Sequence, residues 1–314
     1  MALPGNFDTA VSSWLAEHGQ GSHREATAAL TRSYRSGGTS ATIDLAAYLV
    51  ARLPAIYAAV ARVLAEVKRL QPAFAPRSLL DAGAGPGTAS WAAAACWASL
   101  ESICLFDNNR DFLDLASWLA RLSGHKALLE ARSRQGSVLD LDAPPADLVI
   151  ASYALAELPK SSTVQAALAL WRLTGDTLLL VEPGTPDGFA RILAARKALL
   201  EAGAFPVAPC PHSRKCPIVT PDWCHFSVRL ARSRAHLHAK AANVPFEDEK
   251  FSYLAVSRKE GPLPRSRIVA PPRPGKAGIG FTLCTEEGLQ SVTIARRNRD
   301  AYKRARKLDW GDSF

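Results

Sequence analysis

Four cysteines carry the clearest chemistry in this chain of 314 residues. Three stand in the stretch PCPHSRKCPIVTPDWCHF, and the fourth follows much later in GFTLCTEEG. Soft and borderline metals prefer thiolate ligands, and a set of four serves either structural zinc or an iron–sulfur cluster. The spacing favours a cluster, because zinc sites usually pair their cysteines with about two to four residues between them, whereas five and then seven intervene here. The four candidate metal ligands are Cys210, Cys216, Cys224 and Cys284.

Other interpretations of these cysteines stay open. His212 and His225 could also ligate zinc, which would give a site of three cysteines and one histidine. The thiols could instead be separate core residues, since free cysteine is often buried, although the local sequence is polar and rich in proline. A disulfide framework is not expected in a chain of this length without a secretory signal.

A glycine-rich turn indicates a second site, for a nucleotide-like cofactor. The sequence SLLDAGAGPG predicts a buried strand that runs into a turn at Gly83, Gly85 and Gly87, and an alanine-rich helix follows it. Glycines at this place let the backbone approach a ligand at the helix N-terminus. With Asp81 before the turn, the G-x-G-x-G spacing resembles the first motif of class I S-adenosylmethionine-dependent methyltransferases more than a dinucleotide fingerprint.

Later strands end in polar residues where such an enzyme would hold its cofactor. The segment SICLFD predicts a strand ending at Asp107, which would accept hydrogen bonds from ribose hydroxyls. In VLDLD, Asp140 stands where the adenine amino group would be bound, and the next strand ends near Ser152. The candidate cofactor-binding residues are therefore Asp81, Gly83, Gly85, Gly87, Asp107, Asp140 and Ser152.

The elements that must position these residues alternate between strand and helix, which predicts an α/β protein with a doubly wound, Rossmann-like parallel sheet. A helical pattern precedes the sheet and is interrupted at Pro54. We expect an N-terminal helical region over 1–75, a methyltransferase core over 76–204, a cysteine-rich metal-binding insertion over 205–250, C-terminal strands completing the sheet over 251–295, and a basic tail over 296–314. Among the C-terminal strands, GIGFTLCTEEGLQSVTIARR predicts a hairpin that turns at Glu286, Glu287 and Gly288.

Charge favours an anionic partner. The chain has 38 basic and 29 acidic residues, a net charge of +9, which suits nucleic acid. Between residues 296 and 307, the sequence has seven basic residues and a single acidic one, and this excess of positive charge predicts contacts with RNA phosphates. The alternative is a solvent-exposed helix, which has the same composition. A second basic run lies between Arg229 and Lys240. The candidate RNA-binding residues are Arg296, Arg297, Arg299, Lys303, Arg304, Arg306 and Lys307.

Neither a signal peptide nor a transit peptide is apparent in the first residues, MALPGNFDTAVSSWLAEHG. The most apolar stretch, around residues 89–100, is too short to cross a bilayer. We therefore expect a cytoplasmic, bacterial protein without a membrane partner, monomeric apart from its anionic partner.

Several motifs together resemble the methyltransferase-like family of small-ribosomal-subunit assembly proteins, which has bacterial and mitochondrial members. They are PCPHSRKCP, DWCHFSVRL, VPFEDEKFSYLAVSR, LLDAGAGPGTASWA, ASYALAELP, LLLVEPGTPDGF and ARKLDWGD. The resemblance extends from Tyr48 to Asp312. It implies a class I methyltransferase fold that binds S-adenosylmethionine, and association with the small ribosomal subunit or its 16S-type rRNA. It also implies a 4Fe–4S cluster held by Cys210, Cys216, Cys224 and Cys284, while Cys96 and Cys104 match no ligand position.

The resemblance does not decide whether a methyl group is transferred. Enzymes that methylate amino groups commonly carry an Asn/Asp-Pro-Pro-Tyr motif after the fourth strand, and here that place reads Ser152-Tyr153-Ala154-Leu155. Two functions stay open: a methyltransferase acting on small-subunit rRNA, and a non-catalytic RNA-binding assembly factor in which cofactor and cluster are structural or regulatory.

Overall fold

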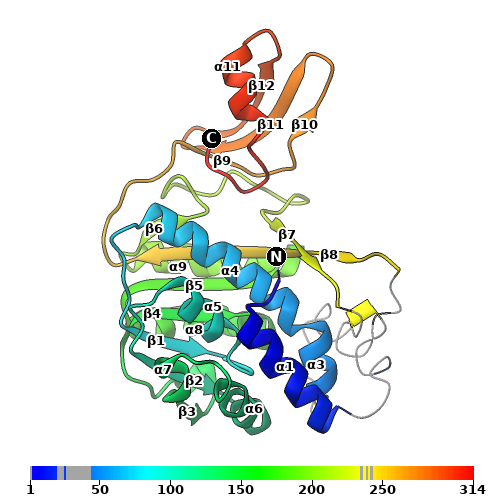
Figure 1. The fold of residues 1–314 in the computed structure, drawn as a ribbon. Helices are drawn as coiled ribbons and strands as arrows, with labels where there is room; N and C mark the ends of the chain where they lie inside the picture. Colours follow the sequence, from blue (N-terminus) through cyan, green and yellow to red (C-terminus); the bar gives the residue numbers. More distant parts are fainter. Residues whose placement is uncertain (1, 20–24, 26–43, 234–235, 238–239, 241–242) are drawn as a thin grey trace.

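The computed structural model describes residues 2–19, 25, 44–233, 236–237, 240 and 243–314. It contains a large mixed sheet covered by helices and a smaller sheet near the C-terminus. Figure 1 shows the smaller sheet and α11 (Arg299–Ala305) beyond one edge of the main sheet, with loops between the two. The expected helical region over 1–75 therefore falls partly outside the described residues.

The main sheet has the strand order β3-β2-β1-β4-β5-β8-β6, and β7 also pairs with β8. Strands β1 to β5 are parallel, whereas β8 runs antiparallel to β5, β6 and β7. This mixed, Rossmann-like sheet is the class I methyltransferase fold, as predicted. The strands are β1 (Ser78–Ala82), β2 (Ser102–Asp107), β3 (Arg132–Gln135), β4 (Ala146–Ser152), β5 (Thr174–Pro183), β6 (Phe205–Ala208), β7 (Phe226–Ala231) and β8 (Phe246–Ser257).

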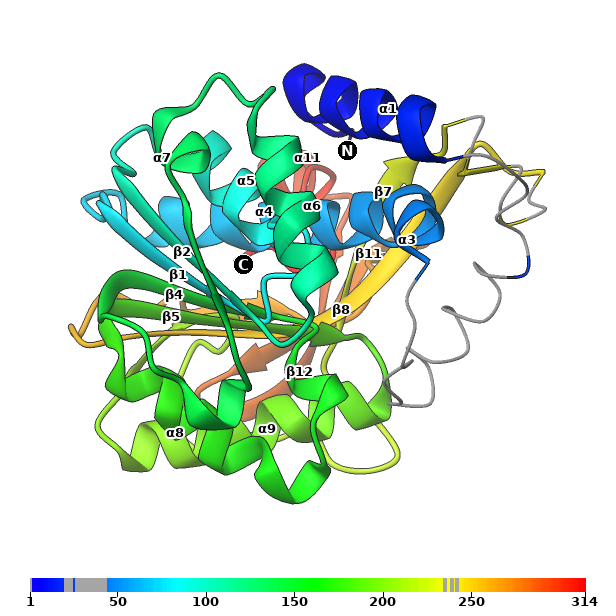
Figure 2. The ribbon, with the colours of Figure 1, turned by 90° about the horizontal axis from the view of Figure 1, so that it is seen from below.

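Helices cover both faces of this sheet (Figure 2). This is required because its strands are apolar on both faces. The N-terminal helices lie on one face with α5, α6 and α7, and α8 and α9 lie on the other. The helices are α1 (Gly5–His18), α3 (Leu45–Ala51), α4 (Leu53–Leu70), α5 (Thr88–Cys96), α6 (Arg110–Ala120), α7 (Lys126–Leu129), α8 (Thr163–Arg172) and α9 (Pro186–Glu201).

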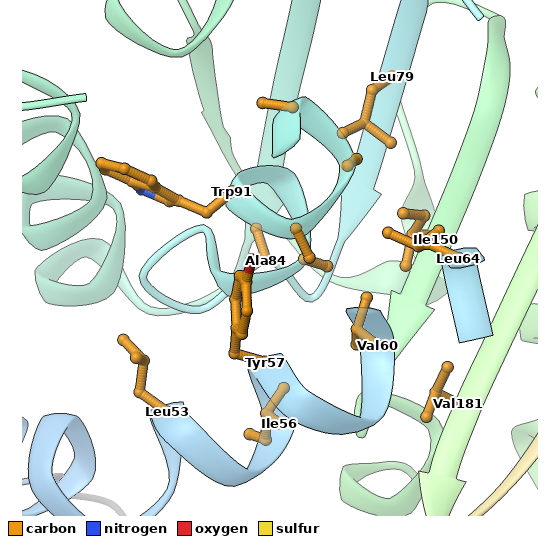
Figure 3. Packing of buried hydrophobic residues seen from close by; sticks show 14 of the residues in the cluster. Leu53, Ile56, Tyr57, Val60, Leu64, Leu79, Ala84, Trp91, Ile150 and Val181 are labelled. Carbon is orange, nitrogen blue, oxygen red and sulfur yellow. The ribbon is translucent and has the colours of Figure 1, made fainter. Parts of the chain in front are cut away.

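Helix α4 packs its apolar stripe against the sheet. Figure 3 shows Val60 and Leu64 of this helix near Ile150 and Val181 of the central strands, with Trp91 of α5 in the same cluster. Pro54 lies in the first turn of α4, where a missing backbone donor is tolerated, and α3 and α4 meet at 48°. Within the described ranges, no single helix is long and apolar enough to span a membrane. The bent pair α3 and α4, taken together, has the length and composition of a span.

The smaller sheet differs from the expectation for residues 251–295. The predicted hairpin forms between β11 and β12, but these strands belong to a separate sheet, and β8 occupies the main sheet instead. Residues 251–257 of β8 are all buried, as an interior strand requires, whereas β12 has a mostly exposed surface. The strands are β9 (Ser266–Ile268), β10 (Arg273–Pro274), β11 (Gly278–Thr285) and β12 (Gly288–Ala295).

A buried arginine fastens the smaller sheet to the rest of the protein. Arg267 of β9 is 1% exposed and forms an ion pair with Glu66 of α4. The same guanidinium donates to the carbonyl oxygens of Gly311, at 2.7 Å, and Pro209, at 2.9 Å. An outer ion pair joins Arg62 to Asp312 at 2.9 Å. Helix α4, the cysteine stretch and the chain's last residues therefore meet at one point.

Candidate functional site

The four predicted cysteines line one cavity of about 30 Å³, although they come from separate elements. Cys210 follows β6, Cys216 lies in the loop after it, Cys224 precedes β7, and Cys284 is on β11 of the smaller sheet. Tyr253 and Leu254 of β8 form part of the wall. The cavity is thus enclosed by both sheets, and residues far apart in the chain meet there.

Burial disfavours the charged form of three thiols at this cavity, and it raises the pKa of Cys216 above its ordinary value. Burial and, after it, the neighbouring Cys210 and Cys216 raise the pKa of Cys284 to about 12. Burial also raises the pKa of Cys224 well above its ordinary value, with the other three cysteines as additional causes. A cation would have to displace these protons, because thiolate is the form that ligates metals.

The described part of the chain contains no group of three or more His, Cys, Asp or Glu side chains placed to hold a metal ion. The structure therefore does not itself contain the predicted metal centre. His212 lies close to the thiols, with Nε2 at 3.5 Å from Sγ of Cys284. His225 instead stacks on Trp223, with ring centroids 4.9 Å apart. Of the two histidines considered as zinc ligands, His212 lines the cavity.

Two buried arginines at this cavity were not predicted. Arg196 of α9 donates from Nε to Sγ of Cys210 at 3.3 Å, and Arg267 also lines the cavity. The sequence does carry a signal for Arg196, because it continues the apolar stripe formed by Ile192 and Leu199 at helical spacing. A charged residue on a buried stripe indicates a specific buried partner.

The glycine turn and the first two predicted acids form one unit. Gly83, Gly85 and Gly87 all have positive φ, a conformation that glycine adopts without strain. Asp107 accepts the backbone N–H of Gly85 at 2.7 Å, and it keeps further acceptor capacity because a carboxylate has several lone pairs. Asp81 is fully buried and accepts from both the backbone and the hydroxyl of Ser90. Asp81 therefore connects the end of β1 to the first turn of α5, on the two sides of the glycine turn.

Asp140 and Ser152 are less closely tied to this turn. Asp140 is exposed on the short helix η1 (Val138–Asp140), and no described hydrogen bond joins it to the glycine turn. Ser152 is half-buried at the end of β4. A Cβ placed on Gly83 would come 2.5 Å from that of Ala154, so glycine is required where the segment after β4 crosses the turn.

Tyr48 of α3 covers the same turn and was not predicted as a site residue. A Cβ on Gly85 would come 3.5 Å from its hydroxyl, and its ring packs on Phe112 with centroids 4.8 Å apart. The N-terminal helical region therefore contributes directly to the candidate cofactor site. The helical spacing of apolar residues in the sequence placed this region only in the hydrophobic core. Tyr48 was therefore missed, because it fits the apolar stripe of a helix.

A buried polar network lies at the carboxyl end of β4. Tyr153 has φ of 59°, a left-handed backbone conformation that is unusual for a residue other than glycine and costs conformational energy. Its hydroxyl donates to Oε1 of Glu249 at 2.7 Å, and Arg52 lies 3.7 Å from the same carboxylate. Burial, followed by the Glu249 charge, raises the pKa of Tyr153 well above its usual range. Sequence spacing gives no signal for a contact between residues so far apart.

The seven basic residues predicted to bind RNA are all exposed, on α11 and the segments beside it. Within the described chain, none of them forms an ion pair. The guanidinium of Arg296 lies 5.8 Å from the ring centroid of Tyr302. We call Arg296, Arg297, Arg299, Lys303, Arg304, Arg306 and Lys307 the basic face.

The second basic run is largely neutralised. Arg229 pairs with Asp248, and Arg232, His236 and Lys240 all surround Glu247. Although burial raises it, hydrogen bonds from His236 and Lys240 lower the pKa of Glu247 to about 2. These cations pair with acids of β8 and so stabilise β8 and the adjacent strand β7. They are therefore weaker candidates for RNA contacts. Arg234 and His238 lie outside the described residues.

The profile of a known protein family, described as mitochondrial small ribosomal subunit Rsm22, matches residues 42–314. The chain belongs to the Rsm22 family. The human ribosome assembly protein METTL17, mitochondrial, is 32% identical over 287 residues, covering 84% of this chain and 61% of that protein. The Rsm22-cox11 tandem protein 2, mitochondrial, of Schizosaccharomyces pombe is 26% identical over 328 residues, covering 85% and 42%. The chain thus spans about two fifths to three fifths of these relatives' lengths.

Solved structures give lower similarity than the Rsm22 relatives do. Magnesium protoporphyrin IX methyltransferase from Synechocystis aligns with a TM-score of 0.46 and 12% identity, covering 75% of this chain and 97% of that one. A putative RNA methyltransferase from Pyrococcus horikoshii aligns with a TM-score of 0.41 and 14% identity, covering 63% and 83%.

The family membership corrects the expected location. The Rsm22 family and both relatives are described as mitochondrial, which contradicts a cytoplasmic, bacterial protein. The prediction was wrong because it treated the lack of an obvious targeting pattern as a sign of the cytoplasm, and the compartment does not follow from the composition of the folded chain.

Proposed function

We propose that this protein binds S-adenosylmethionine, holds a 4Fe–4S cluster, and acts on or with small-subunit rRNA during ribosome assembly. The observation that carries the proposal is the meeting of four cysteines at one cavity in an Rsm22-family chain with a methyltransferase fold. The assembly role is taken from METTL17, which is described as a ribosome assembly protein.

The cofactor part of the proposal is supported by the glycine turn. Gly85 leaves space next to Asp107, whose carboxylate lies at the end of β2 where ribose hydroxyls would bind. Tyr48 would close this site from the side of α3. Asp140 and Ser152 stay proposals for the adenine and methionine ends. When bound, S-adenosylmethionine would supply an electrophilic methyl group.

The cluster part is supported by the donor set. Four thiols without a carboxylate suit iron–sulfur or zinc chemistry rather than a hard cation. In a cluster each cysteine binds a different iron, so its sulfurs stand farther apart than those around a single ion. This agrees with thiols that share a cavity without forming a compact group. Cys210, Cys216, Cys224 and Cys284 are the proposed ligands, and residues 205–250 with Cys284 would form a cluster-bearing lobe.

The RNA part is supported by the basic face. Seven exposed cations on one end of the molecule, with no ion pair to any residue that the structure describes, give a surface that would release counterions on binding phosphates. Helix α11, which carries part of the basic face, packs through Ala305 against β11, the strand that carries Cys284. We propose that cluster and RNA surface are therefore parts of one lobe.

A non-catalytic role is the second candidate, and one observation favours it. Amino-group methyltransferases commonly present an Asn/Asp-Pro-Pro-Tyr motif to the acceptor after the fourth strand. In this protein Tyr153 stands at that place, but it is 2% exposed and its hydroxyl donates to Glu249, so it is not presented to an acceptor. Labelled methyl transfer to immature small subunits separates the two functions. Sustained turnover that is lost in Asp107→Asn would establish the enzyme, whereas cofactor binding without transfer would establish the assembly factor.

The cluster is tested first by replacing one ligand. Protein purified without oxygen is expected to be brown and to contain iron and sulfide, and Cys216→Ser is expected to lose most of both. Cys96→Ser is the matched control, because Cys96 is a half-buried free thiol that does not line the cavity. Metal analysis and the visible spectrum give the result. A colourless protein holding zinc would overturn the cluster and leave the four-cysteine site.

A further inference from the structure

Arg196 is a buried cation without a carboxylate partner in the described chain. It is 5% exposed and lies on the inner side of α9. Arg191, one turn and a half earlier, is equally buried but pairs with Asp187 of its own helix. Burying a charge without a counter-charge costs several kcal/mol, on the order of the full desolvation penalty. A compensating negative charge is therefore required near Arg196.

All the hydrogen bonds of Arg196 go to the cysteine stretch. Nε donates to Sγ of Cys210 at 3.3 Å, and Nη2 donates to the carbonyl oxygens of His212 at 2.8 Å and Arg214 at 2.9 Å. One guanidinium thus fixes three alternate residues of the loop that carries the first two candidate ligands. The planar fork of arginine suits such a set of acceptors, which the single ammonium of lysine would not match.

The other buried arginine at the cavity is already neutralised. Arg267 pairs with Glu66, so its charge is balanced within the protein. Arg196 leaves one excess positive charge beside four thiols. The cavity therefore suits an occupant that carries negative charge.

We propose that Arg196 is a positioning residue of the four-cysteine site: it balances the negative charge of the metal–thiolate centre and holds Cys210 in its ligating position. The inference rests on the proposed metal site. A core bound by four thiolates keeps excess negative charge, whether the core is a cluster or zinc. For a cluster, Arg196 has a further consequence, because N–H···S hydrogen bonds and nearby cations raise the reduction potential.

The test replaces Arg196 in the full chain, purified and reconstituted without oxygen. Arg196→Gln removes the charge and keeps one donor, whereas Arg196→Lys keeps the charge and loses the fork. Arg191→Gln is the matched control, since it removes an equally buried arginine from the same helix. The readouts are the iron and sulfide content, the reduction midpoint followed by visible absorbance, and the rate at which a chelator removes iron.

We expect Arg196→Gln to shift the midpoint to lower potential and to lose iron roughly 10- to 100-fold faster, the range found for residues that orient metal ligands. Arg196→Lys should lie between Arg196→Gln and the unaltered protein, and Arg191→Gln should match the unaltered protein. An Arg196→Gln protein with an unchanged midpoint and unchanged iron loss would overturn the role of Arg196 while leaving the cluster established.

The proposed function fails separately. If the unaltered protein holds zinc, the cluster is wrong, and the same variants are compared by the rate of zinc transfer to a chromogenic chelator. Faster transfer from Arg196→Gln than from Arg191→Gln supports the positioning role, and equal rates overturn it. Protein that binds neither iron nor zinc after reconstitution overturns both proposals.

Discussion

Glu182 is a carboxyl group sealed at the end of β5, and its protonation state follows from its surroundings. It is fully buried, and burial raises its pKa to about 8 despite the hydrogen bond that it accepts from the backbone N–H of Leu155. The folded protein therefore carries a neutral Glu182 at neutral pH. Asp81, also fully buried, has its pKa raised by burial to about 7. At neutral pH, Glu182 is thus mostly protonated and Asp81 is about half protonated.

The raised pKa of Glu182 predicts how stability depends on pH. Between about pH 5 and pH 8 the unfolded chain has released this proton and the folded chain keeps it, so the free energy of unfolding falls as pH rises, by up to about 1.4 kcal/mol per pH unit. Glu182→Gln should abolish this contribution, and the contribution of Asp81 cancels in the comparison. Urea unfolding of both proteins at several pH values measures the difference.

Glu201→Gln, at the exposed end of α9, is the control for Glu182 and should follow the unaltered protein at every pH. Parallel stability curves for Glu182→Gln and the unaltered protein would mean that Glu182 is ionised in the fold. Arg191 would then be its stabilising cation, since its charge acts on this carboxyl group.

At the scale of elements, α11 and its flanks present the basic face. Truncation of the chain before it would be a poor test, because Gly311 and Asp312 are bonded to Arg267 and Arg62. Substitution is sharper. We expect Arg299, Lys303 and Arg306, all changed to Gln, to weaken RNA binding and to flatten its log–log salt dependence by about 0.7 to 0.9 per lost phosphate contact.

The control for the basic face removes the same charge elsewhere. Arg110, Lys126 and Lys197 are exposed and pair with acids on their own helices, so their change to Gln alters net charge equally. Filter binding to small-subunit rRNA over a range of salt concentrations compares the two triple variants. Equal slopes for both would remove the basic face from the interface.

The elements also show what could be predicted. The strand–glycine turn–helix unit was predicted correctly because its pattern lies within one short stretch of sequence, from Ser78 to Cys96. The cysteines were predicted as one set from residue type and spacing, and they do line one cavity. Tyr48, Arg196 and Glu249 were missed because tertiary packing brings them to their sites. The β11–β12 hairpin was predicted from its turn, but turn chemistry does not say which sheet a hairpin joins.

At the scale of the whole molecule, the Glu66–Arg267 pair decides how firmly the smaller sheet is attached. Glu66→Gln would leave the guanidinium of Arg267, 1% exposed, without its carboxylate. Removing one partner of a buried pair is expected to cost about 3 to 5 kcal/mol of unfolding free energy. Urea unfolding followed by tryptophan fluorescence measures the loss, and limited proteolysis shows whether the smaller sheet opens first.

Arg69→Gln is the matched control, because Arg69 binds the same carboxylate from a side chain that is 53% exposed. A surface pair of this kind contributes about 0 to 1 kcal/mol. Equal losses for Glu66→Gln and Arg69→Gln would contradict the assignment of the buried pair as the attachment of the smaller sheet.

The division of the cysteines between the two sheets has a consequence for biosynthesis. Cys210, Cys216 and Cys224 leave the translating ribosome well before Cys284, and Arg267 gains its bond to Gly311 only after residue 311 has emerged. A nascent chain therefore offers three thiols in an unfinished pocket until Cys284 and Gly311 are free to fold. Delivery of the proposed metal centre would then have to follow their emergence, and a chain that stops before Cys284 would lack the means to retain it.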